Sequence, residues 1–131
     1  MPFVYHQRSG RLAAPDGSVL AVGYAGYDDG DGVPEPGEGK NDPGMERVKM
    51  VGPLPAGRWA MGPAFDHARL GTCCIPLLPL PGTRTYGRSG FLVHGDSRKQ
   101  PGAGSHGCVV MPLAVRQQLA AASDRVLEVV A

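Results

Sequence analysis

The sequence predicts a mainly β (β-rich α+β) domain with one helix in its C-terminal region. The chain has 131 residues, close to the commonest size of a single domain, so we expect one domain over residues 1–131. Its 20 glycines and 13 prolines disfavour long helices and favour short strands joined by many turns. Short apolar runs bounded by Gly, Pro or Asp indicate the same class.

Several stretches have the length and composition of strands. In chain order they are residues 3–6, 18–26, 57–63, 70–78, 89–95 and 125–131. In the last of them Val126, Glu128 and Val130 alternate with Leu127 and Val129. Such an alternation is typical of a strand with one half-exposed face.

One helix is expected over residues 112–123, "PLAVRQQLAAAS". Pro112 suits the first helical position, because its missing N–H would have no partner there in any case. Ala, Leu, Gln and Arg follow, and all of them are good helix formers. This helix would begin just after Cys108.

The acidic stretch of residues 28–42 holds six of the twelve acidic residues and one basic residue. Its glycines and prolines predict a solvated loop. Asp29, Asp31, Glu35 and Glu38 suggest a calcium site as an alternative. The EF-hand register is missing, however, because Val33 stands where a third ligand is needed.

Overall composition excludes several function classes. Hydrophobic residues make up 42%, charged residues 19%, and the net charge is +1, so no general attraction to nucleic acid or to a membrane surface is expected. No apolar run approaches the roughly 20 residues that span a bilayer. The start "MPFVYHQRSGRL" lacks the regions of a signal peptide, so we expect synthesis in the cytoplasm without one.

Three cysteines cannot all pair within the chain. Cys73 and Cys74 are neighbours in the apolar run "LGTCCIPLLPL", where they suit small core positions. A disulfide framework is therefore not expected, and Cys108 is the free thiol whose role must be explained.

Cys108 has the surroundings of a nucleophile. A thiol reacts as the thiolate, so it needs a base or a positive charge nearby and partial exposure. Gly107 permits a tight turn that presents the sulfur at a strand end, and main-chain N–H groups at such a turn can stabilise an oxyanion. The candidate base is His94, at the end of the apolar run "FLVH" and fourteen residues before the cysteine. That separation allows two adjacent strands to lie side by side.

The residues around this pair resemble a known family. "VHG" followed by "SHGCVV" is similar to the signature of L,D-transpeptidase (YkuD-like) catalytic domains. The segments "GKNDPGMERVKMVGPLPAGRW" and "YGRSGFLVHGDS" resemble the short subfamily of L,D-transpeptidase-related toxins delivered by bacterial type VI secretion. The likeness runs from about residue 18 to residue 130, and it implies a single sandwich- or barrel-like β domain.

The resemblance implies a role for each matching position. Cys108 is the nucleophile, His94 is the base, and Gly95 positions the imidazole through its backbone. The amide of Cys108, with a neighbour, would form the oxyanion hole. The residues expected to shape the turn and bind substrate are Ser105, His106 and Gly107.

Basic residues flank the motif, with Asp96 as the only acid among them. They are Arg84, Arg88, Arg98 and Lys99. One interpretation is a solvated basic face. The other is attraction of a substrate that carries carboxylates, with Arg88 as the candidate to grip one of them.

The implied activity is that of a cysteine L,D-carboxypeptidase or L,D-transpeptidase. Its substrate would be the peptidoglycan tetrapeptide stem, with no cofactor and no metal. Val110 stands where cell-wall transpeptidases have Arg or Asn, and the gap between the two motifs is short. Both departures favour the toxin subgroup, secreted to act in the periplasm of a target bacterium. The resemblance also implies the type VI secretion machinery and a cognate immunity protein as partners.

Other functions stay open on the sequence alone. A zinc hydrolase could use His94, Asp96, His106 and Cys108, although these residues lack the usual ligand spacings. A cysteine protease, a non-enzymatic binding module, and a housekeeping or phage-associated L,D-transpeptidase are the further alternatives.

Overall fold

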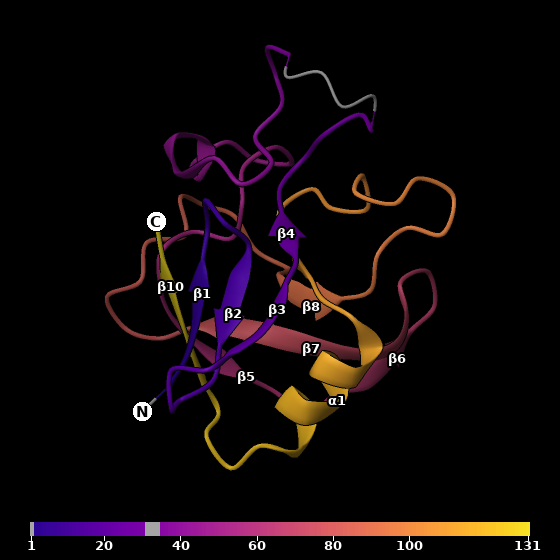
Figure 1. The fold of residues 1–131 in the computed structure, drawn as a ribbon. Helices are drawn as coiled ribbons and strands as arrows, with labels where there is room; N and C mark the ends of the chain where they lie inside the picture. The colour runs from indigo at the N-terminus through magenta and orange to yellow at the C-terminus, as the bar shows by residue number, and fades with distance from the viewer. Residues whose placement is uncertain (1, 31–34) are drawn as a thin grey trace.

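The computed structural model describes residues 2–30 and 35–131. Over these residues the chain forms one nearly closed, barrel-like sheet and a single α-helix (Figure 1). The mainly β class with one helix is therefore confirmed. Among the described residues, no helix has both the length and the apolar character needed to cross a membrane.

The strands are short, as the many turn residues predict. Their bounds are β1 Phe3–His6, β2 Arg11–Ala13, β3 Val19–Val22, β4 Tyr24–Ala25, β5 Gly57–Met61, β6 Phe65–His67, β7 Gly71–Pro79, β8 Leu92–His94, β9 Val109–Val110 and β10 Val126–Val130. They lie in the order β3-β2-β1-β10-β5-β7-β8-β9-β4, and β6 pairs with β7 beside this path.

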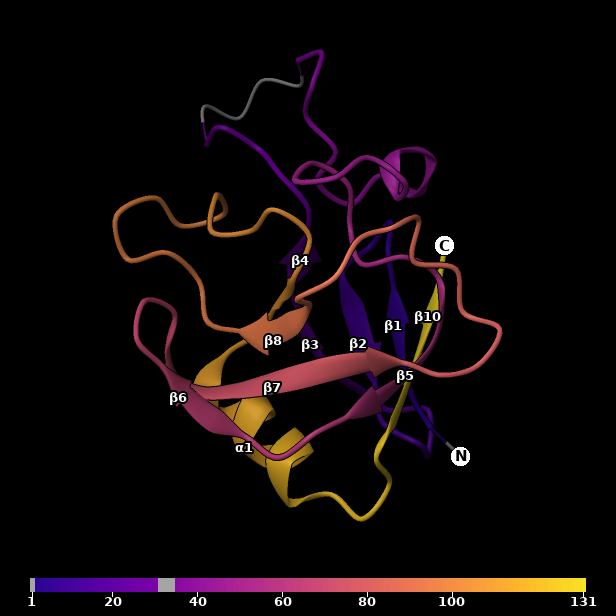
Figure 2. The same cartoon turned by 180° about the vertical axis from the view of Figure 1, so that it is seen from behind.

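The long strand β7 joins the two halves of the sheet (Figure 2). It pairs antiparallel with β5 on one side and with β8 on the other. Beyond β8 follow β9, parallel to it, and β4, antiparallel to β9. The two motif strands β8 and β9 are therefore direct neighbours.

Helix α1, Leu113–Ala121, packs beside β7. Its inward side chains Val115 and Leu119 join the hydrophobic core. Pro112 is not the first helical residue as expected, because it has φ −60 and ψ 155 and serves as the N-cap. The residue before a helix commonly keeps such an extended backbone, so the helix starts one position later.

The core fills the space between the sheet and α1. Trp59 is fully buried, packs edge-on against Phe91 with ring centroids 5.2 Å apart, and donates from Nε1 to the carbonyl oxygen of Pro55. Such pairs of large aromatic rings contribute strongly to burial. They fix the position of Phe91, which immediately precedes β8.

The expected strand over residues 18–26 is divided into β3 and β4. Gly23 separates them, and this position requires glycine because a Cβ here would lie 1.9 Å from the carbonyl oxygen of Val110. The strands β2 and β6 were not expected, and β9 was expected as the strand beside that of His94 but without bounds. Each has only two or three residues, too few to show a period in the sequence.

Two long connections lie at the same end of the molecule (Figure 1). One is the segment between β4 and β5, whose described residues are drawn in purple to magenta, and the other is the loop between β8 and β9, drawn in orange. Lys40 of the first donates to the carbonyl oxygen of Gly102 in the second, at 2.7 Å. The candidate site lies beside the second connection.

Candidate active site

His94 and Cys108 lie on adjacent strand segments and face the same side. In the β8–β9 register Val93 is level with Val109, and His94 is level with Val110. Val93 and Val109 both belong to the core. Because side chains alternate along a strand, His94 and Cys108 point to the opposite side, where both line one cleft.

The cleft has a volume of about 1090 Å³. Its walls come from β8, the β8–β9 loop, the β6–β7 turn, the β7–β8 loop, the start of α1 and part of the segment between β4 and β5. Among the described residues that line it, the cationic side chains are Lys49, Arg69, Arg88, Arg98, Lys99 and Arg116, and the acidic one is Asp96. The cleft therefore favours an anionic ligand.

The thiol of Cys108 is half-buried, with main-chain groups as its polar neighbours. Its Sγ accepts from the amide of Leu92 at 3.3 Å and lies 3.8 Å from the carbonyl oxygen of Gly90. Burial raises the pKa of this thiol, while the Leu92 amide and the positive charge of Arg88 act in the opposite direction. At neutral pH the group is therefore a thiol that needs a base to become a nucleophile.

His94 has the surroundings of such a base. It is 2% exposed, and its Nδ1 lies 2.7 Å from the carbonyl oxygen of Gly95. A carbonyl oxygen only accepts, so Nδ1 carries the proton and Nε2 has a free lone pair. Burial lowers the pKa of the imidazole, with a smaller contribution in the same direction from Arg116.

Ser105 and Gly107 shape the turn before the cysteine. Ser105 is 1% exposed, and its hydroxyl donates to the carbonyl oxygen of Cys108 at 2.6 Å. The hydroxyl oxygen Oγ of Ser105 accepts from the amides of Gly107 and Gly26, at 3.0 and 3.1 Å. These contacts use the hydroxyl within the protein, so they give Ser105 the turn-shaping part of its expected role and leave no free group for substrate.

Gly107 has φ +149, a conformation that L side chains rarely adopt. A Cβ at this position would come within 2.5 Å of Nη2 of Arg88. The turn that presents Cys108 therefore requires glycine for two independent reasons.

Arg88 lies behind this turn and is 5% exposed. Its Nη1 donates to the carbonyl oxygens of Glu46 and Pro53, and its Nη2 donates to those of Gly52 and His106. The guanidinium also stacks over the ring of Phe91. Because main-chain groups occupy both Nη atoms, Arg88 is placed to support the turn and not to grip a substrate carboxylate, which was its expected role.

His106 is exposed on the rim of the cleft. Its ring stacks on that of Tyr27, with centroids 5.4 Å apart and an angle of 14° between the planes. Of the three turn residues expected to bind substrate, it is the one whose side chain the cleft can reach.

The β8–β9 loop is held to β4 by a small polar network. Tyr24 donates its hydroxyl proton to Oδ1 of Asp96 and accepts from the amide of Gly104 at 2.7 Å. Asp96 also accepts from the amides of Ser97 and Gly102. Tyr24 therefore orders the chain that runs from His94 toward Cys108. The sequence carried no motif that pointed to it.

No protein-family model, curated protein or solved structure matches the chain. The roles given to Cys108, His94 and Gly95 therefore rest on the geometry of this chain and on the resemblance of its motifs.

The residues of the zinc alternative do not converge. Among the described residues, the group of His, Cys, Asp and Glu side chains whose ligand atoms lie within 4.8 Å of one another is Asp28, Asp29 and Glu38. That group does not include His94 or Cys108. Asp96 is also already bonded to Tyr24, so we propose no metal at this site.

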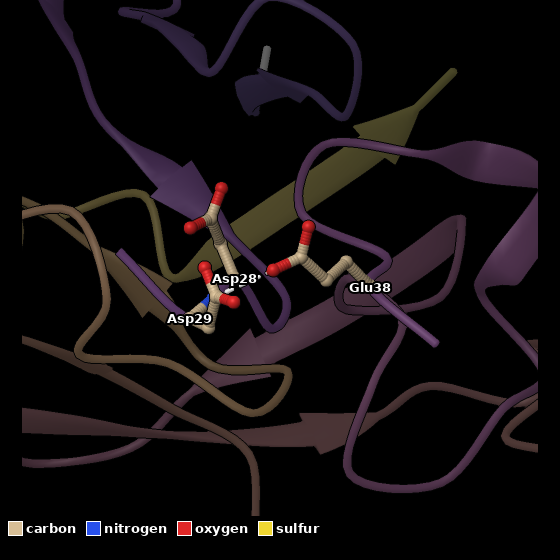
Figure 3. Close-up of side chains that lie close together, drawn as sticks. All are labelled: Asp28, Asp29 and Glu38. Atoms are coloured by element: carbon tan, nitrogen blue, oxygen red, sulfur yellow. Dashed lines mark hydrogen bonds between the residues drawn. The ribbon is translucent and has the colours of Figure 1, made fainter. Parts of the chain in front are cut away.

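Asp28, Asp29 and Glu38, which all belong to the acidic stretch, lie close together (Figure 3). Glu38 accepts from the amides of Asp29 and Glu35, and Asp28 accepts from that of Gly30. The carboxylates thus cap the backbone of the loop, as acidic side chains often do in turns. Asp31 and Val33, on which the calcium alternative also depended, lie outside the described residues.

Arg116 was missed by sequence reasoning, although it lines the cleft near His94. Its position in the predicted helix could have indicated a special role. Arg116 falls on the same face as Val115 and Leu119, at the spacing of a core-facing stripe. A charged residue at such a position calls for a specific partner.

Proposed function

We propose that the chain is a cysteine acyl-transfer enzyme that acts on peptidoglycan tetrapeptide stems, as an L,D-carboxypeptidase or L,D-transpeptidase. The observation that carries the proposal is the placement of Cys108 and His94 on neighbouring parallel strands, lining one cleft, with Nδ1 of His94 held by Gly95. A thiol and a neutral imidazole that share one cleft are a combination used for nucleophilic catalysis. The choice of substrate rests on the motif resemblance and agrees with the cationic cleft.

In the first step the thiol turns from Gly90 toward Nε2 of His94, which takes its proton. The thiolate attacks the carbonyl carbon of the third stem residue, and a C–S bond forms. His94 returns the proton to the amine of the terminal D-alanine as the C–N bond breaks, and a thioester remains. Water resolves the thioester in a carboxypeptidase, and an amine of a D-amino acid or of a second stem resolves it in an exchange reaction or a transpeptidation.

Groups near Cys108 can stabilise the negative charge of the thiolate and of the intermediate that its attack forms. The Leu92 amide already points at Sγ, and the buried charge of Arg88 lies behind the turn. Preorganised donors of this kind stabilise developing negative charge without the cost of reorganising water.

The direct test is incubation with purified tetrapeptide muropeptides, with and without an added D-amino acid, and identification of the products by mass. Loss of the terminal D-alanine supports the proposal. An exchanged terminal residue in the presence of the D-amino acid adds the transferase activity, and a cross-linked product would favour the housekeeping alternative. Unaltered stems under all these conditions would refute the proposal.

We further propose that the protein is a toxin delivered by type VI secretion into the periplasm of a target bacterium, where it trims or caps stems. A cognate immunity protein would protect the producer. The resemblance to the toxin subfamily is the support for this part. Export of the protein to the periplasm of a test bacterium should arrest growth, and the same protein kept in the cytoplasm should not. Equal growth with exported wild type and exported Cys108→Ala would contradict the toxin role.

A further inference from the structure

Arg116 is a buried cation whose guanidinium is only partly used by the protein. It is 7% exposed. Its Nε donates to the carbonyl oxygen of Met111 at 3.0 Å, and its Nη1 donates to those of Thr72 and Cys73 at 2.5 and 3.4 Å. Among the described residues, Nη2 has no hydrogen-bond partner and no carboxylate pairs with the guanidinium.

The free Nη2 lies beside Gly95. A Cβ built on Gly95 would be 2.8 Å from it, and both residues line the cleft. Arg88 differs in this respect, because carbonyl oxygens occupy both of its Nη atoms. A buried cation without a counter-ion is costly to maintain. Arg116 is therefore fixed on two sides and keeps one donor group available to an anion in the cleft.

The strand register sets the order of the three groups. Cys108 stands one residue before the Val93–Val109 pair, and His94 is level with Val110, one residue after it. The separation along the strands is about 7 Å. Arg116 is bonded to Met111, one residue further on. Along the strands the nucleophile comes first, the base second and the guanidinium third.

This order matches the order of the reacting groups when the last peptide bond of a chain is cut: the carbonyl carbon, the leaving amine and the terminal carboxylate. The thiolate attacks the carbonyl carbon, and His94 gives its proton to the leaving amine. In a C-terminal amino acid the carboxylate is attached to the same α-carbon as that amine. A cation on the far side of His94 from Cys108 is therefore where the carboxylate of a single leaving residue falls.

We propose that Nη2 of Arg116 binds the free carboxylate of the residue that leaves, so that the enzyme releases single C-terminal residues and does not cut within longer peptides. This inference rests on the proposed function and names the group that determines its exopeptidase specificity. The bonds made and broken are those of the first step above. The leaving residue departs as a free amino acid with its carboxylate unchanged.

The test compares two stem substrates that differ only at the end, a tetrapeptide with a free terminal carboxylate and the same tetrapeptide as its C-terminal amide. For the wild-type protein we expect kcat/KM to be at least about 10-fold higher on the acid. One hydrogen bond to a charged group changes a rate or binding constant by about this factor or more. In Arg116→Gln the preference should disappear, mainly through loss on the acid. Arg116→Lys should restore part of it. Arg98→Gln, which removes an exposed cation from the same cleft, should keep the preference.

The outcomes separate this inference from the function on which it rests. Equal kcat/KM of the wild-type protein on acid and amide would overturn the inference while leaving the proposed activity in place. That comparison needs no variant, so it stands even if Arg116→Gln fails to fold. A preference that survives unchanged in a folded Arg116→Gln would also overturn it. Cleavage of neither substrate by the wild-type protein would refute the proposed function itself.

Discussion

Nδ1 of His94 lies 2.7 Å from the carbonyl oxygen of Gly95, the next residue in the chain. This contact determines which nitrogen of the ring carries the proton, and it leaves Nε2 as an acceptor. In the proposed mechanism, the same carbonyl oxygen would stabilise the imidazolium that forms when the ring takes a proton from the thiol. One main-chain group thus does the orienting work that a carboxylate does in many catalytic triads.

The pH dependence of the proposed activity should follow from the burial of His94. Burial lowers the pKa of this histidine below its ordinary value of 6.5. The ring is the required base when neutral, so kcat/KM should fall only as the pH drops through that lowered pKa. We expect the midpoint of the acid limb below pH 6.5. His6→Gln, which removes a histidine that does not line the cleft, should leave this limb in place, and a wild-type midpoint above 6.5 would contradict the assignment.

Arg88 should stabilise both the fold and the thiolate. Arg88→Met leaves several buried carbonyl oxygens without donors, and each such group costs about 1–3 kcal/mol, so we expect a loss of at least about 2 kcal/mol in the free energy of unfolding. The pKa of Cys108 should rise further, because the charge of Arg88 opposes the effect of burial. Denaturant unfolding and the pH profile of Cys108 alkylation measure the two effects.

The matched control for Arg88 is Arg84→Met, since Arg84 is exposed and does not line the cleft. Alkylation is followed by peptide mapping, which distinguishes Cys108 from Cys73 and Cys74. Equal free energies of unfolding for Arg88→Met and Arg84→Met would show that the contacts of Arg88 do not stabilise the fold.

Gly107→Ala should damage the site more than a glycine substitution with backbone strain alone. Gly107 has φ +149 and a Cβ would meet Nη2 of Arg88 at 2.5 Å. Gly17→Ala is the control, because Gly17 has φ +90 but no atom within 4 Å of the added methyl. We expect about 1–2 kcal/mol of lost stability for Gly17→Ala from strain, and more for Gly107→Ala, together with lower kcat. A smaller loss at Gly107 would contradict the described turn.

Tyr24→Phe should loosen the loop that joins the two motif strands. It removes the hydroxyl that bonds Asp96 and the amide of Gly104, and a buried group left unpaired costs about 1–3 kcal/mol. We expect faster amide hydrogen exchange at Gly104 and lower kcat/KM. Tyr27→Phe serves as the control, since the stacking of its ring on His106 is retained. Unchanged exchange in Tyr24→Phe would argue against the network.

Features that depend on neighbouring residues could be predicted from the sequence. The strand β1, the core of β7 and the helix α1 come from local apolar patterns and helix-forming residues. The adjacency of His94 and Cys108 was likewise expected, because a short Gly-rich connection between two apolar runs brings their ends together. The single strand expected over 18–26 is interrupted at Gly23. The close contact there is with the carbonyl oxygen of Val110, a residue far along the chain, so the local sequence did not indicate it.

Features that depend on distant contacts were missed or misassigned. Arg88 and Arg116 are both arginines near the motifs, and nothing local distinguishes one with occupied donors from one with a free Nη2. The difference arises because Arg88 meets carbonyl oxygens of residues 46–53, whereas Arg116 meets those of β7. The role of Tyr24 depends in the same way on a residue 72 positions away.

The claim that Cys108 is the nucleophile is tested most directly by the turnover of tetrapeptide stems by the wild-type protein, Cys108→Ala and Cys73→Ala. Cys73 is a half-buried free cysteine that does not line the cleft, so its substitution controls for the loss of a thiol elsewhere. We expect release of D-alanine by the wild type and by Cys73→Ala, and none by a folded Cys108→Ala. Release of D-alanine by Cys108→Ala at the wild-type rate would contradict the proposed mechanism.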